Sequence, residues 1–117
     1  MLKKEKHKKY DLEDRTLQFS KDIIDFVRNT PKILSSIEIA KQLMRSASSV
    51  GANYIEANES LSKKDLIMRL KISKKEAKES IYWLRLSESQ EIHKKEKLIN
   101  EAIELMNILG SIIQKVQ

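Results

Sequence analysis

The sequence predicts an all-α protein that folds as an antiparallel up-down-up-down four-helix bundle. Among its 117 residues only two are glycine and one is proline, so little of the chain can form turns or irregular loops. Apolar residues make up 40% of the chain and charged residues 34%, a balance too apolar for disorder and typical of helices with long solvated faces. Apolar side chains recur at helical spacing in four segments, at about residues 12–29, 34–59, 63–90 and 96–116.

The first helix is expected to follow a basic arm. Residues 1–10 (MLKKEKHKKY) have no apolar periodicity, so we expect a flexible arm that precedes a bundle formed by residues 11–117. Asp11 or Asp14 can open the helix, and Pro31 closes it. Steps of three, four and seven residues place its apolar side chains on one face: Leu12, Phe19, Ile23, Phe26 and Val27.

The second helix carries two adjacent heptad rows, so it should be central in the bundle. Small residues in the first row allow another helix to approach closely, while Ser46 and Asn53 place hydrogen-bonding groups in the second. The first row contains Ile37, Ala40, Met44, Ala47, Gly51 and Tyr54, and the second contains Ile39, Leu43, Ser46, Val50, Asn53 and Ala57.

The third helix has a start signal at Ser62, which is followed three residues later by Asp65. Its apolar stripe contains Leu66, Leu70, Ser73, Ala77, Ile81 and Leu84, broadened by Met68, Ile72, Trp83 and Leu86. A turn is expected at residues 93–96. The fourth helix then has the most regular heptad pattern of the chain, with Leu98, Ala102, Leu105, Met106, Leu109, Ile112, Ile113 and Val116.

A single long coiled coil is the second fold considered. Pro31 and the breaks near Leu61 and Lys94 interrupt the heptads, which favours four antiparallel helices joined by short links. The extra apolar stripes on the second and third helices indicate contact with other subunits, so we expect a homo-oligomer.

Several chemistries lack the residues they require. The chain has no cysteine, which removes disulfides and thiolate metal sites and favours the reducing cytoplasm. A di-iron bundle needs Glu-x-x-His pairs, but the residues three before His7 and His93 are Lys4 and Gln90. Neither GxxxxGK[ST] nor GxGxxG occurs, and no apolar run reaches the roughly 20 residues of a membrane span. We therefore expect no catalytic residues, cofactor, metal, small-molecule substrate or membrane partner.

A polar set on the second helix is interpreted as structural. Arg45 and Glu56 are about three helical turns apart, too far to pair with each other, so each should find a partner on a neighbouring helix. Buried polar groups can fix the register of a bundle or an oligomer, whereas a ligand pocket is the less favoured interpretation. The structural set is Arg45, Ser46, Ser49, Asn53 and Glu56.

Lysines on the third helix are the candidate functional residues. A formal net charge of +6 and a pI near 9.5 favour an acidic partner such as RNA or DNA. Glu76 and Glu79 interleave with the lysines, so a merely solvated helix face is the equal alternative. Tyr82 and Trp83 are interpreted as packing residues in preference to a base-stacking platform. The predicted nucleic-acid-binding set is Lys63, Lys64, Lys71, Lys74, Lys75, Lys78 and Arg85.

Three stretches resemble the bacterial family of 23S ribosomal RNA intervening-sequence proteins: RTLQFSKDIIDFV (15–27), RSASSVGANYIEANESLSKKD (45–65) and LKISKKEAKESIYWLRL (70–86). The resemblance implies an antiparallel bundle that assembles as a ring-shaped homopentamer. It also implies kinship with the accessory protein of diversity-generating retroelements, a basic pentamer that binds nucleic acid and a reverse transcriptase. The family has no established enzymatic activity, and Ile81 stands where many relatives are expected to carry a basic residue.

The leading hypothesis is therefore a non-enzymatic, oligomeric bundle that binds nucleic acid through repeated basic surfaces. Its rival is a protein interaction scaffold, or an accessory subunit with no nucleic-acid role, in which the lysines only confer solubility. An enzyme is a distant third hypothesis.

Overall fold

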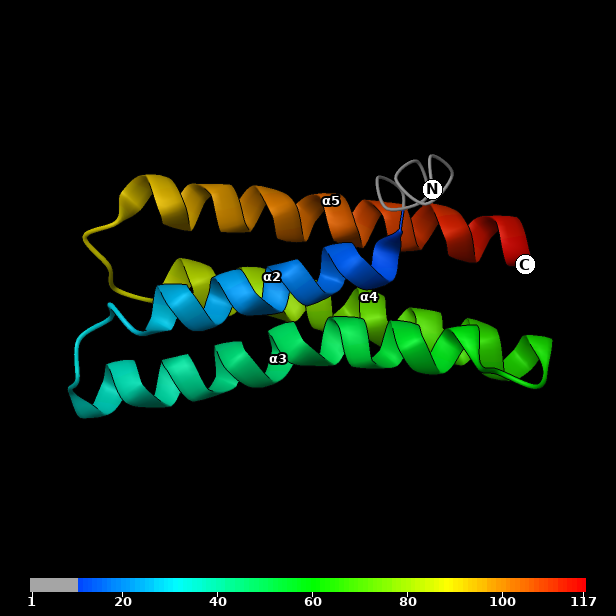
Figure 1. Ribbon diagram of the computed structural model, residues 1–117, viewed down its shortest axis with the longest axis horizontal. Coiled ribbons are helices and arrows are strands. Elements are labelled where there is room, and N and C mark those ends of the chain that lie inside the picture. The colour runs from blue at the N-terminus through cyan, green and yellow to red at the C-terminus, as the bar shows by residue number, and fades with distance from the viewer. Residues whose placement is uncertain (1–10) are drawn as a thin grey trace, which may run out of the picture.

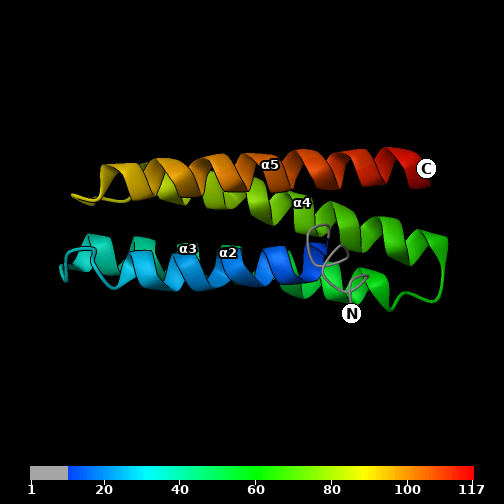
Figure 2. The same cartoon turned by 45° about the horizontal axis from the view of Figure 1, so that its top comes forward.

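The computed structural model describes residues 11–117, and the predicted basic arm at 1–10 lies outside the described residues. Four α-helices follow one another: α2 (Leu12–Val27), α3 (Leu34–Asn58), α4 (Lys63–Leu86) and α5 (Ile92–Val116). The chain reverses direction at each link, so that successive helices run antiparallel (Figure 1). The α2–α3 and α4–α5 links lie at one end of the molecule, and the α3–α4 link lies at the other with the C-terminus (Figures 1 and 2). The predicted all-α four-helix bundle is confirmed.

Side-chain caps fix two of the helix starts. Asp11 Oδ1 accepts the backbone N–H of Glu13 at 2.9 Å, and Ser62 Oγ accepts the N–H of Asp65 at 3.1 Å. Both caps satisfy a donor that the first helical turn leaves without a partner. These are the start signals that the sequence predicted for α2 and α4.

The first helix ends two residues before the predicted limit. The backbone N–H groups of Asn29 and Thr30 donate to the carbonyls of Phe26 and Val27, three residues earlier instead of the four of an α-helix. The buried hydroxyl of Thr30 also donates to the Val27 carbonyl at 2.8 Å. These bonds occupy carbonyls that a continuing α-helix would use, so the helix stops at Val27.

The prediction was wrong about the link between the third and fourth helices. Ser87 is buried and extended, and its hydroxyl donates to the Leu84 carbonyl at 2.7 Å, so α4 ends at Leu86 instead of residue 90. The predicted turn at 93–96 is the first turn of α5, where lysine and glutamate favour helix. The link therefore consists of residues 87–91, and the serines in it interrupt the helix.

The core draws on all four helices, and α3 and α4 are the most extensively packed pair. Serine hydroxyls replace apolar contacts at the seam between these two helices. Ser46 Oγ and Ser80 Oγ are 2.9 Å apart, and Ser73 Oγ donates to the Val50 carbonyl at 2.7 Å. Among the described residues no buried side-chain polar atom lacks a hydrogen-bond partner. The largest fully buried apolar side chains are Phe19, Phe26, Ile23, Leu43, Leu70, Leu84, Leu105, Leu109 and Val50.

α2 lies close to α3 but is joined more loosely to α5. Ser20 Oγ donates to the Ala47 carbonyl at 3.3 Å, and Thr16 packs directly on Gly51. The predicted close approach at the small residues of the second helix is therefore present. The edge between α2 and α5 is bridged by ion pairs, including Arg15 with Glu101 at 2.7 Å.

The outer part of the predicted double stripe is not covered within the chain. Ile37 and Met44 of the first α3 row are exposed, and so are Met68 and Leu86 of α4. None of the helices in residues 11–117 has an apolar run long enough to cross a membrane.

Candidate nucleic-acid interface

The predicted cations of α4 are all exposed. Lys71, Lys74, Lys75, Lys78 and Arg85 share one face, because their spacings of three, four and seven residues return to the same side of a helix. They extend over about 21 Å of helix at 1.5 Å per residue. We call these five residues the basic stripe.

The other two predicted cations lie in the first turn of α4. Lys63 lies beside the α3–α4 link, in a hollow that Leu61 and Leu66 also line. Lys64 is exposed next to it. Lys63 is therefore about 12 Å from Lys71 along the helix axis, at the far end of the same element.

The basic stripe borders a groove between α4 and α5 that contains two hollows. The first, which we call the lysine hollow, has a volume of about 680 Å³ and includes Lys71 and Lys74. The stem of Lys74 crosses α5 at Gly110, where a Cβ atom would lie 3.5 Å from the Lys74 Nζ. None of the described side chains that line this hollow is acidic, and its other polar side chains are Asn107, Ser111, Gln114 and Gln117.

The second hollow is apolar, with cations around it. It has a volume of about 640 Å³, and Met106 lines it as well as the lysine hollow, so the two adjoin. Ile81, which is only 7% exposed, contributes from α4. The other lining residues are Tyr82 and Ile103, the cations Lys75, Lys78 and Arg85, and one acid, Glu79. We call this the apolar hollow.

The acids that interleave with the stripe in the sequence pair with an arginine of α3 in the fold. Arg45 of α3 pairs with Glu79 and, at 3.4 Å, with Glu76. Glu79 also accepts the indole N–H of Trp83 at 2.8 Å. This hydrogen bond and the Arg45 cation hold the pKa of Glu79 below its ordinary value. None of the predicted α4 cations, by contrast, forms a salt bridge within residues 11–117.

The structural polar set of α3 divides into paired and unpaired members. Arg45 has the cross-helix partners that the sequence predicted, and Asn53 accepts from Arg69 at 3.3 Å. Ser46 bonds across the α3–α4 seam, whereas Ser49 donates to the Arg45 carbonyl of its own helix at 2.7 Å. Glu56 is exposed and its carboxylate has no salt-bridge partner among the described residues, so the partner expected for it is not found there.

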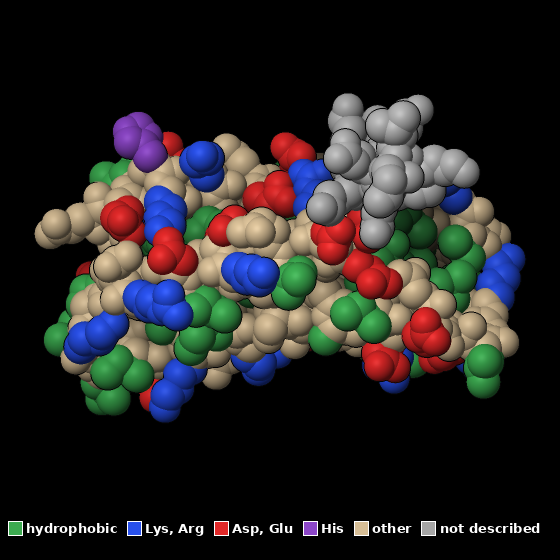
Figure 3. Space-filling view, viewed as in Figure 1, with side chains coloured by type: hydrophobic (Ala, Val, Ile, Leu, Met, Phe, Trp, Pro, Cys, Tyr) green, Lys and Arg blue, Asp and Glu red, His purple; other side chains and the backbone are tan. Residues whose placement is uncertain are grey.

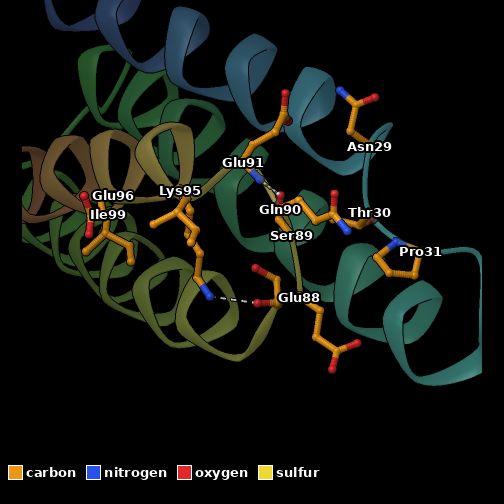
Figure 4. Close-up of a pocket in the computed structure, with 12 residues that line it drawn as sticks. Asn29, Thr30, Pro31, Glu88, Ser89, Gln90, Glu91, Lys95, Glu96 and Ile99 are labelled. Carbon is orange, nitrogen blue, oxygen red and sulfur yellow. Dashed lines mark hydrogen bonds between the residues drawn. The ribbon is translucent and has the colours of Figure 1, made fainter.

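Other surfaces of the molecule mix their charges. On the face that α2 and α3 present, acidic and basic side chains alternate and apolar patches lie between them (Figure 3). A hollow of about 1040 Å³ at the end of the bundle lies between the α2–α3 and α4–α5 links (Figure 4). It contains Glu88, Glu91 and Glu96 but only one cation, Lys95, which donates to the Ser87 carbonyl at 2.8 Å. Three carboxylates against one ammonium make this hollow a poor phosphate site.

Sequence reasoning missed the contribution of α5 to the groove. Asn107, Ser111 and Gln114 follow one another at steps of four and three, which places them on one polar face. That spacing could have predicted an exposed polar face on α5, whereas the heptad pattern predicts only which residues are buried. Met106, predicted in the apolar heptad pattern, is half-buried against the core and also lies at the boundary of the two hollows.

Residue types that bind metals do not form a metal site in the described part of the chain. Within residues 11–117 no group of three histidine, cysteine, aspartate or glutamate side chains could hold a metal ion. His93 is exposed in the first turn of α5, and His7 lies outside the described residues.

Comparison with known proteins gives a family and similar solved structures. The profile of the 23S rRNA-intervening sequence protein family matches residues 8–114. Among solved structures, the chain is similar to a protein of unknown function from the S23 ribosomal protein family of Bacteroides thetaiotaomicron. The two are 34% identical with a TM-score of 0.76, over 86% of this chain and 96% of that one. Curated proteins offer no match, and neither description above indicates an enzyme family.

Proposed function

Since the chain belongs to the 23S rRNA-intervening sequence protein family, we propose that it is a non-enzymatic helical bundle of the cytoplasm that binds RNA or DNA. The observation that carries the proposal is the basic stripe: five exposed cations on one face, with no salt bridge inside the described part of the chain. A partner with repeated negative charge is the natural counterpart of such a surface.

Phosphate contacts explain how this surface would bind. Each lysine that neutralises a phosphate releases condensed counterions, so the affinity falls steeply with salt concentration. Lysine ammonium groups act as point charges and contact the backbone of the nucleic acid, which carries no sequence information. The proposed activity is therefore strongly salt-dependent binding with little sequence preference.

The test compares two variants of equal charge. Lys71→Gln/Lys75→Gln/Lys78→Gln removes three charges from the stripe, and Lys21→Gln/Lys41→Gln/Lys97→Gln removes three from exposed positions on α2, α3 and α5. Anisotropy of a labelled duplex DNA is followed between about 50 and 200 mM salt. The stripe variant should lower the slope of log affinity against log salt by about 2.7, since each lost phosphate contact contributes about 0.9.

Equal losses in the two variants would mean that net charge alone attracts the probe, and the stripe would not be the interface. Absence of binding by the wild type at the lowest salt would refute the proposal. Circular dichroism of both variants establishes that each remains folded, so that a loss of binding cannot be assigned to unfolding.

We further propose that the chain assembles with copies of itself, as a pentamer by resemblance to its family. Exposed apolar side chains on α2 and α3 support this proposal. Leu17 and Ile24 are one heptad apart on α2, and Ile37, Met44 and Ile55 share a face of α3. Light scattering that gives the chain mass of 13.6 kDa at micromolar concentration would refute assembly.

The same apolar side chains favour the alternative role as a protein scaffold or accessory subunit. They lie on different helices from the basic stripe, so a protein partner and a nucleic acid would not compete for one surface. The Met44→Glu/Ile55→Glu variant separates the two roles. Assembly or partner docking should be lost, whereas binding of one nucleic acid by each subunit should remain.

A further inference from the structure

We infer that the groove between α4 and α5 binds single-stranded nucleic acid, with an unpaired base in the apolar hollow and the adjoining phosphates on the lysines. The inference rests on the proposed function and specifies its substrate class. A duplex presents phosphates but hides the faces of its bases, so it could use the basic stripe without ever filling the apolar hollow.

The composition of the apolar hollow carries the first step. A surface that bound only phosphates would need cations and hydrogen-bond donors, as the lysine hollow provides with Lys71 and Lys74. The next hollow along the groove instead has Ile81, Ile103 and Met106 in its lining. Apolar side chains repay burial only against an apolar ligand, and a base has apolar faces.

Tyr82 supplies the aromatic surface. It is 59% exposed, which is unusual for a large ring in a helix of a packed bundle, and it lines the apolar hollow. Trp83 meets it edge to face, with ring centroids 5.0 Å apart and planes at 76°, and Trp83 is itself anchored by its bond to Glu79. The structure thus separates two aromatics that the sequence suggested were both for packing: Trp83 packs, and Tyr82 faces solvent.

The cations are spaced to hold the strand on either side of that base. Lys78 precedes Tyr82 by one helical turn, and Arg85 follows it by slightly less than one turn. Along the axis these steps are about 6 Å and 4.5 Å. The one acid at the hollow, Glu79, shares the Arg45 cation with Glu76, so its charge is partly offset, and three cations, Lys75, Lys78 and Arg85, outnumber it there. Cation, aromatic ring and cation therefore alternate, the pattern of surfaces that bind single strands.

The test uses two single strands of equal charge, one with bases and one without, and a duplex. A labelled thymidine strand, an abasic strand of the same length and a duplex are titrated with the full chain at one salt concentration. Tyr82→Ala should weaken binding of the thymidine strand by about 5- to 150-fold, the range for loss of one stacked base. Binding of the abasic strand and of the duplex should change less than about twofold, because both rely on the lysines.

Two control variants isolate the ring. Tyr82→Phe keeps the ring and should bind like the wild type, whereas Leu86→Ala removes an exposed apolar side chain that does not line the apolar hollow and should have no effect. Light scattering of Tyr82→Ala reports whether assembly has changed.

The outcomes separate this inference from the proposed function. Equal affinity for thymidine and abasic strands, with Tyr82→Ala unchanged, would overturn the single-strand inference while leaving phosphate binding intact. Failure of all three probes to bind would overturn the proposed function and the inference with it. A changed assembly mass of Tyr82→Ala would assign the apolar hollow to a protein contact instead. The same assignment would follow if the thymidine and abasic strands bind equally well and an acidic apolar peptide displaces them.

Discussion

Replacing Gly51 with alanine tests the closest approach in the bundle. An added Cβ would lie 2.9 Å from Thr16 Oγ1 and 3.2 Å from Thr16 Cβ. Thr16 cannot yield easily, because it is fully buried and its β-branched side chain has few rotamers in a helix. Overpacking of this kind costs about 2–3 kcal/mol, and the gain in helix propensity returns about 1 kcal/mol, so we expect a net loss of about 1–2 kcal/mol.

Gly110 provides the matched control within the same chain. Its Cβ would meet only the mobile end of Lys74, at 3.5 Å and beyond, which is ordinary contact. Gly110→Ala should therefore keep the full gain in helix propensity, about 0.5–1 kcal/mol. Both substitutions add the same methyl group to a helix interior, so the difference between them measures the α2 contact.

Thermal unfolding at one fixed protein concentration measures both variants. An unfolding entropy of about 2.1 cal/mol/K per residue gives roughly 4 °C of Tm per kcal/mol for this chain length. Gly51→Ala should then lower Tm by about 4–8 °C, and Gly110→Ala should raise it by about 2–4 °C. The Thr16→Ala/Gly51→Ala double variant should lose less than the two single changes together, because the Oγ1 contact is already gone. Equal stabilisation by both glycine substitutions would show that α2 does not approach α3 as described.

Three further predictions concern polar contacts of the bundle. Arg15→Lys should cost about 0.5–1 kcal/mol in urea unfolding, because the two bonds of the guanidinium to Glu101, at 2.7 and 2.8 Å, become one; no change would mean that this edge is not held by the pair. The pKa of Glu79 is lower in the folded chain, so the contribution of this carboxylate to stability is present at neutral pH and is lost as the pH falls below its ordinary pKa of 4.5. In unfolding curves recorded from pH 7 to 3, the difference in free energy of unfolding between wild type and Glu79→Gln should therefore become smaller. A difference that grows as the pH falls would contradict the direction of the pKa shift. Ser73→Ala should cost about 1 kcal/mol in the same urea assay, because the bond to the Val50 carbonyl is lost at a buried site; a stabilised variant would place that hydroxyl elsewhere.

The fold was predictable because apolar periodicity and caps are local signals. Four stripes, a cap at Ser62 and a stop at Pro31 are readable without any knowledge of neighbouring helices. The link after α4 was misplaced because its determinant is not local. Ser87 ends the helix with its hydroxyl on the Leu84 carbonyl while buried by the rest of the bundle, whereas the charged residues 93–96 looked like a loop and are good helix formers.

Only part of the candidate site could be predicted from the sequence, again because the rest depends on contacts that are not local. The cations of α4 can be identified from the sequence. The groove, however, is also formed by α5, and the sequence does not show which face of α5 packs against α4. The sequence does not show that Lys74 packs on Gly110 of α5, or that Asn107 lines the same hollow as Lys74. The state of Glu76 and Glu79 was likewise undecidable, because it depends on Arg45, more than thirty residues away in the chain.

The pairing of Glu76 and Glu79 with Arg45 supports the proposed interface over a merely solvated face. Within α4 the stripe brings like charges together at spacings of three and four residues among Lys71, Lys74, Lys75 and Lys78. Each such pair costs a helix about 0.2–0.5 kcal/mol, so the arrangement opposes folding. The acid that could relieve it, Glu79, follows Lys75 by four residues in the weaker order, and Arg45 engages it instead. Both acids of this segment thus pair with α3, whereas the five cations of the basic stripe have no salt bridge within residues 11–117, and this difference supports the proposed interface.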